Sequence, residues 1–169
     1  RASLEKASRD TWAALAEIFL SKYPKSEGLR ETTIRDYHRA LQGPDVQDWA
    51  DRPIATITRK DIRGKLDTVV ERAPIHANRL RSYWGKFFGW LLEKDWVEVN
   101  PVQGVARPVP ERSRDRFLTE QEIPIIWQAL DAAGPAFADM LKVLLLTGQR
   151  EGEIAALRWS EVVDLDGEN

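Results

Sequence analysis

The chain has 169 residues, of which 43% are hydrophobic and 31% are charged, and its formal net charge is -2. This length can bury one substantial core or two small ones, and the composition is typical of a soluble globular protein. Cysteine is absent, which excludes disulfide bridges, thiolate zinc sites and a cysteine nucleophile. No apolar run is long enough to span a membrane or to form a signal core, so the expected location is the cytoplasm.

Charge is distributed unevenly along the chain. Residues 1–116 contain 22 Lys and Arg against 17 Asp and Glu, a net +5, whereas residues 117–169 contain 3 against 10, a net -7. Such asymmetry suggests that the basic part contacts nucleic acid. The excess in the basic part is mild, so a merely solvated surface is an equal alternative on charge alone.

The first two expected helices are amphipathic. Apolar residues at helical spacing predict a helix over 10–22, which Pro24 should stop soon afterwards. The same pattern predicts a second helix over 33–41, closed by Gly43 and Pro44. The outward face of this second helix supplies the first candidate contacts to a polyanion, which are Thr33, Arg35 and Arg39.

Two further helices are expected before residue 100. Thr58 followed by Asp61 resembles a capping box, which predicts a third helix over 59–72. A fourth helix should begin near Pro74, and it carries a wide apolar stripe. The members of this stripe are Leu80, Tyr83, Trp84, Phe87, Phe88, Leu91 and Leu92.

The opposite face of the fourth helix is unusual because no Asp or Glu occurs between Glu71 and Glu93. Its polar positions are Asn78, Arg79, Ser82 and Lys86, with glycines at 85 and 89. A surface helix normally mixes both signs of charge, so an acid-free face with glycines that permit close backbone approach favours contact with DNA. The alternative is a solvated helix whose glycines serve packing.

Residues 100–116 should contain a domain boundary, because they include three prolines and show no apolar periodicity. We place the first domain at 1–106, a basic linker at 107–116 and the second domain at 117–169. The linker arginines could follow DNA phosphates or could simply solubilise the segment. The linker arginines are Arg107, Arg112, Arg114 and Arg116, of which the last three are the candidate DNA contacts.

The second domain should begin with helices and reach a strand. Thr119 and Glu122 form a TxxE capping box for its first helix. Further helices are expected over 136–146, as a buried element, and over 150–159. The apolar residues of 162–165, followed by Asp-Gly, predict a strand that enters a hairpin.

The segment LLLTGQREGEIAALRW, residues 144–159, places charge immediately after an apolar helix. Gly148 would let the backbone turn sharply before Arg150. A cation at a helix N-terminus opposes the macrodipole, which disfavours a purely structural role for Arg150. Its guanidinium is suited to a phosphate, because it can donate two parallel hydrogen bonds. We expect it to be accessible, with Ile154 and Leu157 facing inward.

This segment resembles the first catalytic box of the tyrosine recombinases, the phage-integrase family of site-specific DNA recombinases. The family pattern is TGxRxxEhxxLxWxDh, where h is apolar. The matching residues are Thr147, Gly148, Arg150, Glu153, Ile154, Leu157 and Trp159, with Glu161 where the family usually has Asp. The resemblance extends to the first catalytic-domain helix in RFLTEQEIPIIWQAL, to the domain end at Asn100-Pro101, and to a core-binding domain over 10–100.

The resemblance implies a mainly α fold, in which a four-helix SAM-like core-binding domain precedes a truncated, mostly helical start of the α+β catalytic domain. It implies that Arg150 binds the scissile phosphate and that Glu153 helps to shape the active site. It implies double-stranded DNA at an attachment site as partner, and a homotetramer on DNA for the full-length protein. No cofactor, metal, membrane or small-molecule substrate is expected.

In this family the complete enzyme cleaves DNA by tyrosine attack and holds the cut end as a phosphotyrosine. The family also supplies a lysine, an HxxR pair and the nucleophilic tyrosine after the first arginine, and none of these follows Arg150. The tyrosines and histidines that are present all precede it, at Tyr23, Tyr37, Tyr83, His38 and His76. We therefore expect an inactive, DNA-binding fragment of an integrase from a prophage or integrative element.

Two alternatives come from other functional classes. The first is a non-catalytic helical DNA-binding regulator, with REGEIAALRWSEV as half of a helix-turn-helix. It is disfavoured because the residues after Trp159 predict a strand instead of a recognition helix. The second is a helical protein-interaction scaffold, which would show no salt-dependent affinity for DNA.

Overall fold

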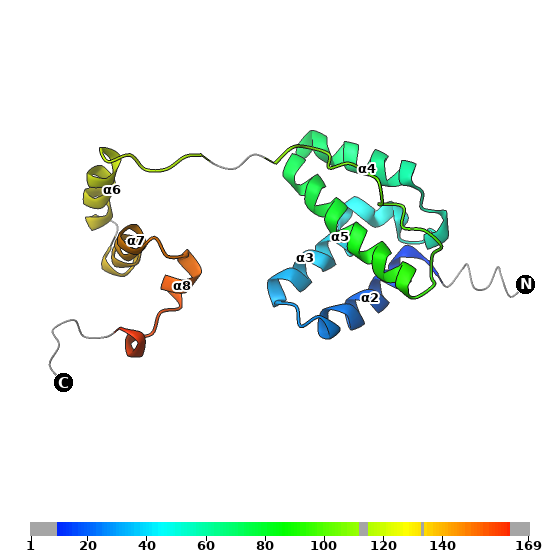
Figure 1. Cartoon of the computed structure of the whole chain (residues 1–169), viewed down its shortest axis with the longest axis horizontal. Helices are drawn as coiled ribbons and strands as arrows, with labels where there is room; N and C mark the ends of the chain where they lie inside the picture. The colour runs from blue at the N-terminus through cyan, green and yellow to red at the C-terminus, as the bar shows by residue number, and fades with distance from the viewer. Residues whose placement is uncertain (1–9, 112–114, 133, 163–169) are drawn as a thin grey trace, which may run out of the picture. The chain divides into compact units, whose positions relative to one another are not determined.

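The computed structural model describes residues 10–111, 115–132 and 134–162. The chain divides into two compact units, Arg1–Arg112 and Ser113–Asn169, and each is described by itself (Figure 1). In the described ranges both units are helical, which confirms the expected mainly α fold, and an isolated antiparallel bridge joins Thr11 to Pro53. The strand expected from residue 162 onward lies almost entirely outside the described residues.

The described part of the first unit contains four α-helices. They are α2 (Trp12–Ser26), α3 (Glu31–Gln42), α4 (Arg59–Arg72) and α5 (Pro74–Glu93), with the short 3-10 helices η1 (Pro44–Trp49) and η2 (Ile54–Thr56) between α3 and α4. The four helices predicted from the sequence are all present. The end expected for the first of them is wrong, because α2 continues through Pro24 to Ser26. Pro24 costs only one hydrogen bond there, near the end of the helix, and its ring is buried.

The core of the first unit is built around Trp12, which is 1% exposed. The rings of Trp49 and Phe87 each lie 5.2 Å from it in edge-on contact. The indole N–H of Trp12 donates to the Leu41 carbonyl at 2.7 Å, and that of Trp84 donates to the Ala40 carbonyl at 2.9 Å. The last carbonyls of a helix have no partner within the helix. These two tryptophans therefore join α2 and α5 to the end of α3.

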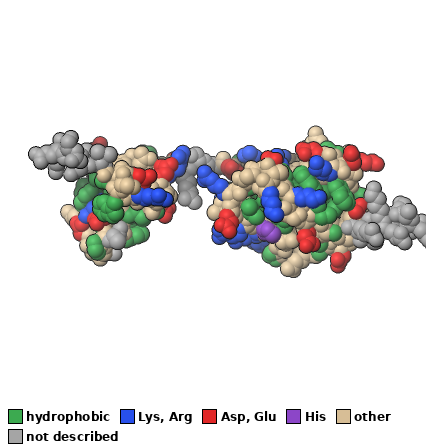
Figure 2. Space-filling model, turned by 90° about the horizontal axis from the view of Figure 1, so that it is seen from below, with side chains coloured by type: hydrophobic (Ala, Val, Ile, Leu, Met, Phe, Trp, Pro, Cys, Tyr) green, Lys and Arg blue, Asp and Glu red, His purple; other side chains and the backbone are tan. Residues whose placement is uncertain are grey.

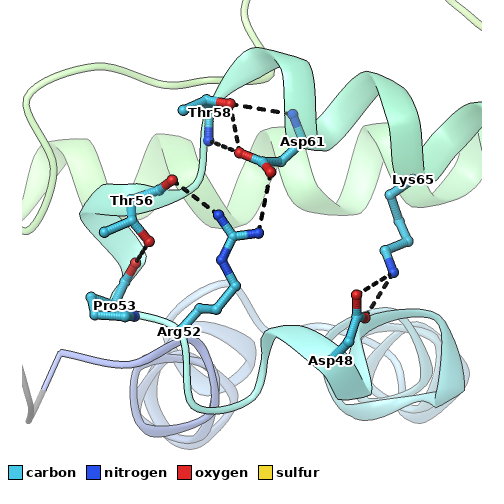
Figure 3. A network of polar contacts seen from close by, with 7 residues as sticks. All are labelled: Asp48, Arg52, Pro53, Thr56, Thr58, Asp61 and Lys65. Atoms are coloured by element: carbon cyan, nitrogen blue, oxygen red, sulfur yellow. Dashed lines mark hydrogen bonds and ion pairs between the residues drawn. The ribbon is translucent and has the colours of Figure 1, made fainter.

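A polar network fixes the start of α4 (Figure 3). The Thr58 backbone N–H donates to Asp61 at 2.8 Å, and the Asp61 N–H donates back to the Thr58 hydroxyl at 3.3 Å, which confirms the predicted capping box. Arg52 donates to Asp61 at 3.2 Å and to the Thr56 carbonyl at 3.1 Å. Hydrogen bonds from Thr58 first, and then from Arg52, hold the pKa of Asp61 well below its usual range.

The second unit contains α6 (Glu122–Asp131), α7 (Pro135–Thr147), α8 (Glu151–Ala155) and the 3-10 helix η3 (Trp159–Glu161). The helix expected over 150–159 is wrong in length, because α8 ends at Ala155 and a break precedes η3. The expectation that 136–146 is buried is also wrong, since Leu146 is 74% exposed. Within the described residues α7 packs mainly against α6 and α8, which leave part of its surface uncovered.

The predicted TxxE motif forms its reciprocal hydrogen bonds. The Thr119 N–H donates to Glu122 at 2.9 Å, and the Glu122 N–H donates to the Thr119 hydroxyl at 3.3 Å. The Thr119 backbone, followed by Arg116, lowers the pKa of Glu122. None of the helices described combines the length and the apolar character that crossing a membrane requires.

Replacing Asp61 with Asn should lower the free energy of unfolding by about 1 kcal/mol at pH 7, because the cap weakens. The folded pKa of Asp61 lies below its unfolded value of about 3.9. Its contribution is therefore present above that value and is lost as the pH falls through the folded pKa. Urea unfolding should show a smaller deficit at pH 3 than at pH 7.

Asp67→Asn on the same helix is the matched control. The described residues give Asp67 no side-chain hydrogen bond, so this change should alter the free energy of unfolding by less than about 0.5 kcal/mol. Equal deficits for the two variants, or a pH-independent deficit for Asp61→Asn, would contradict the network.

Candidate phosphate-binding turn and nucleic-acid interface

The α7–α8 junction is a sharp turn made by the Thr-Gly pair. Gly148 has φ 63° and ψ 15°, the left-handed conformation that glycine adopts without a steric penalty. Its N–H donates to the Leu144 carbonyl at 2.9 Å, and the Thr147 hydroxyl donates to the Val143 carbonyl at 2.7 Å. The sequence Thr-Gly therefore closes α7 and directs the chain into Arg150 at the start of α8.

Arg150 and Glu153 face each other at the start of α8. The guanidinium donates to Glu153 Oε1 at 3.1 Å, and the Arg150 backbone N–H donates to Oε2 at 3.2 Å. The Arg150 side chain is 88% exposed and the Glu153 side chain is 50% exposed. Exposed ion pairs contribute about 0–1 kcal/mol. The pair thus orients Arg150 loosely and leaves most of its donors accessible to an anion.

The apolar residues of this motif are less buried than the sequence suggested. Ile154 is half-buried, as are Leu144 and Leu145. Leu157 is 47% exposed, so the expectation that it faces inward is wrong. The reason is local: α8 ends before Leu157, which therefore does not share the inward face of the helix. Trp159 is 90% exposed.

Two groups of basic side chains in the first unit differ in whether they are paired with acids. In the described part of the chain, Arg35, Arg39, Arg79 and Lys86 are exposed and form no ion pair. The second group is paired with acids, as Arg72–Asp45, Lys65–Asp48 and Arg52–Asp61. Figure 2 shows Lys and Arg side chains interspersed with Asp and Glu over one face of this unit. The cations of α3 and α5 are therefore among those free to contact an external anion, together with exposed basic residues of α2 and α4 such as Lys22, Arg59 and Arg63.

A hollow of about 410 Å³ connects these two helices, and its walls include both basic and acidic groups. It is lined by Asp36, Asn78, Arg79, Ser82, Tyr83 and Glu111. The Tyr83 hydroxyl donates to Asp36 at 3.2 Å across it. Although α5 has no acidic residue on this face, Asp36 and Glu111 from other parts of the chain lie beside it. Thr33 is half-buried on α3, and Ser82 donates to the Asn78 carbonyl of its own helix.

Asn78 does not lie on an open surface, although the sequence made it a candidate DNA contact. It is 3% exposed. Its amide donates to the Val109 carbonyl at 2.8 Å and to Glu111 at 2.9 Å, and it accepts from the Val109 N–H at 3.2 Å. All three hydrogen bonds therefore join Asn78 to the chain's own connector. The assignment of Asn78 as an exposed contact is thus corrected.

The two glycines of α5 also serve the chain itself. A Cβ at Gly85 would lie 3.6 Å from Val102, and one at Gly89 would lie 3.9 Å from the Asn100 amide. Asn100 donates to the Gly85 carbonyl at 3.0 Å. The segment that lies against this face of α5 is therefore residues 100–111, which are called the strap below. Both distances are ordinary van der Waals contacts, so the strap would accept a Cβ at either position, but its place against both glycines favours the packing alternative over a DNA-facing role.

Of the three linker arginines considered as DNA contacts, Arg116 lies within the described residues. Arg112 and Arg114 lie outside the described residues. Arg116 is paired with Glu122 at 2.6 Å and is 65% exposed. Sequence reasoning missed Asn100, Arg81 and Glu111 as strap contacts, because each acts on residues at least 15 positions away. Among these three residues, only Asn100 had a signal in the local sequence, which was the Asn-Pro pair at the domain end.

The three tyrosines belong to the first unit. Tyr23 and Tyr37 are 7% and 6% exposed, and Tyr83 is half-buried. Burial raises the pKa of Tyr37 and of Tyr83, whereas a nucleophilic tyrosine must lose its proton readily. Among the described residues no group of three or more His, Asp or Glu side chains converges on a possible metal site.

Comparison with known proteins finds relatives of one kind. No family model matches the chain. It is 26% identical to the integrase of Enterobacteria phage 434 over 150 residues, covering 86% of this chain and 42% of that protein. It is also 26% identical to the tyrosine recombinase XerD of Haemophilus influenzae over 155 residues, covering 85% and 50%. The chain thus spans about half the length of the curated relatives it matches.

Solved structures with a similar fold include those of lambda integrase. A lambda integrase tetramer bound to a Holliday junction matches with a TM-score of 0.82 and 23% identity, covering 96% of this chain and 48% of that one. A lambda integrase(75-356) dimer bound to a COC' core site matches with a TM-score of 0.79 and 23% identity, covering 91% and 56%.

Replacing Arg150 with Ala should change the free energy of unfolding of this chain by less than about 0.5 kcal/mol, because only an exposed ion pair is lost. Leu130→Ala in the same unit should cost about 2 kcal/mol or more, because Leu130 is 8% exposed. Thermal unfolding followed by circular dichroism measures both. Unfolding of the second unit by Arg150→Ala would show that this arginine is structural.

Proposed function

We propose that this chain, which belongs to the tyrosine recombinase family, is a DNA-binding part of a site-specific recombinase that acts in DNA integration and recombination. Its relatives among phage integrases and XerC and XerD recombinases support this function. The observation that carries the proposal is the Gly148 turn, which presents one exposed guanidinium beside a single carboxylate. Arg150 is proposed as a ligand of the scissile phosphate, with Glu153 as its positioning partner.

The chemistry of strand exchange explains why an arginine suits this position. In transesterification a nucleophilic oxygen forms a bond to phosphorus while the bond to the leaving sugar oxygen breaks. Negative charge then grows on the non-bridging oxygens, and a guanidinium can donate two parallel hydrogen bonds to them without losing its own proton. The surroundings of Tyr23, Tyr37 and Tyr83 suit none of them for nucleophilic attack.

The proposed DNA surface is the α3–α5 face of the first unit. Arg35, Arg39, Arg79 and Lys86 would contact phosphates, because they are exposed and unpaired in the described part of the chain. Thr33 and Ser82 would add neutral hydrogen bonds. Arg112, Arg114 and Arg116 are proposed as contacts from the connector. Asp36 and Glu111 on the same face should repel phosphates and limit how the duplex can lie.

The proposed partner is double-stranded DNA at an attachment site, bound by four copies of the whole protein. The lambda integrase structures, one a dimer on a core site and one a tetramer on a Holliday junction, support this assembly. The regulator alternative is less well supported, because α8 has five residues and is followed by a break instead of a recognition helix. The relatives found are recombinases, which also disfavours a scaffold.

Binding of duplex DNA by this chain should weaken steeply with salt, with log K falling by about 0.9 per phosphate neutralised for each unit of log salt concentration. Arg79→Ala should weaken binding and reduce the slope by about one, because it removes one phosphate contact. Fluorescence anisotropy at several salt concentrations measures both effects.

Lys65→Ala is the control for this experiment, because it removes the same charge from a side chain already bound to Asp48 at 2.7 and 2.8 Å. It should leave the salt slope unchanged. Equal effects of the two substitutions would show that net charge alone is responsible. Binding that is independent of salt would remove the proposed interface and favour the scaffold.

In the whole recombinase, Arg150→Ala should lower the rate of strand cleavage by about 10²-fold or more while DNA affinity stays nearly constant, because stabilisation of the transition state is lost. Arg150→Lys should not restore the rate, since one ammonium cannot reproduce the planar pair of donors. Single-turnover cleavage of a nicked duplex measures both. Cleavage within a few-fold of normal would show that Arg150 is not catalytic.

A further inference from the structure

The strap is attached to α5 along its whole length. Asn100 donates to the Gly85 carbonyl at 3.0 Å, Arg81 donates to the Val105 carbonyl at 2.6 Å, and Asn78 bonds to Val109. Two apolar residues of the strap, Val102 and Val105, are buried, with 3% and 4% exposure. In Figure 1 this part of the chain runs back beside α4 and α5 after α5 ends. About half of the residues expected to form a free linker, 107–111, therefore belong to the strap.

Asn78 forms the last backbone attachment of the strap. Its amide both donates to the Val109 carbonyl and accepts from the Val109 N–H, which is the pairing that a neighbouring strand would offer. The Asn78 amide also donates to the Glu111 carboxylate, two residues further along the strap. Because the Asn78 side chain is buried, loss of these bonds would leave polar groups unpaired, and the strap would have to be released or hydrated.

We propose that Asn78 is a positioning residue that fixes where the connector leaves the first unit, and hence the length of chain that holds the unit carrying Arg150. Without this attachment, the next backbone anchor is Val105, whose carbonyl accepts from Arg81. The exit point would then move back by four residues, which is up to about 14 Å of extended chain. That distance is large against the roughly 34 Å turn of duplex DNA.

Hydrogen exchange and distance measurements on the DNA-free chain test this proposal, so its outcome does not depend on the proposed function. Asn78→Ala should accelerate exchange of the Val109 amide by about tenfold or more, while amides in the middle of α4 and α5 stay protected. The chain has no cysteine, so dyes can be placed at Lys60→Cys and Gln128→Cys, which are both exposed. The distribution of dye distances should broaden by roughly a fifth.

Two further proteins separate tether length from folding. Asn78→Leu keeps a similar side-chain size but loses the two donated hydrogen bonds and the one accepted from the Val109 N–H, so it should reproduce both effects if Asn78→Ala unfolds. Insertion of Gly-Ser-Gly-Ser after Ser113 in the otherwise unchanged chain should broaden the distances equally without accelerating exchange at Val109. Thr68→Ala, which removes a hydroxyl bonded only to the Gly64 carbonyl of its own helix, should change neither quantity.

Unchanged exchange at Val109 in a folded Asn78 variant would overturn the proposal, since the attachment would not depend on Asn78. Faster exchange with an unchanged distance distribution would also overturn it, because the exit point would not control the second unit. Accelerated exchange throughout α4 and α5 in both Asn78 variants would assign Asn78 to general stability instead. Coupled changes confined to Val109 and the inter-dye distances would support it.

Discussion

The two indole hydrogen bonds to the end of α3 are the constraint on which the first unit depends. They join α2 and α5 to the same turn of α3, and they satisfy carbonyls that the helix itself cannot pair. With Trp84 fixed in this way, the remaining faces of α5 are also fixed. One face then presents Arg79 beside α3, and another receives the strap through Asn78 and Gly85. The proposed DNA surface and the connector are thus positioned by the same helix.

The paired acids of the first unit decide which cations remain available. Asp45 and Asp48 of η1 accept from Arg72 and Lys65 of α4, while Asp61 accepts from Arg52. These pairs lie near the surface, so each adds little to stability. Their larger effect is on the distribution of charge, because they neutralise α4 on its η1 side. The cations of α3 and α5 are not in these pairs, so an extended anion could meet several of them there.

Local patterns allowed the helices to be predicted from the sequence, whereas contacts between distant residues were not predictable. The capping box at Thr58 and the turn at Gly148 depend on neighbours within a few residues, so their residue types alone indicate them. The role of Asn78 depends on Val109, 31 positions away, and the glycines of α5 suit a strap as well as they suit a phosphate backbone. The spacing of these residues cannot show whether they face the strap or a DNA backbone. The position of residues 100–111 in the structure does show it.

The weakness of the Arg150–Glu153 pair is consistent with the proposed role of Arg150. A buried, fully satisfied pair would hold the guanidinium firmly, but a phosphate could displace the carboxylate only at a large cost in free energy. At 88% exposure the guanidinium is still hydrated, so exchanging Glu153 for a phosphate oxygen costs little. Gly148 lets the chain take the left-handed turn that ends α7 without a steric penalty, and the Arg150 side chain that follows it stays exposed. Glu153 can then keep one hydrogen bond to the Arg150 backbone N–H while the guanidinium turns toward its substrate.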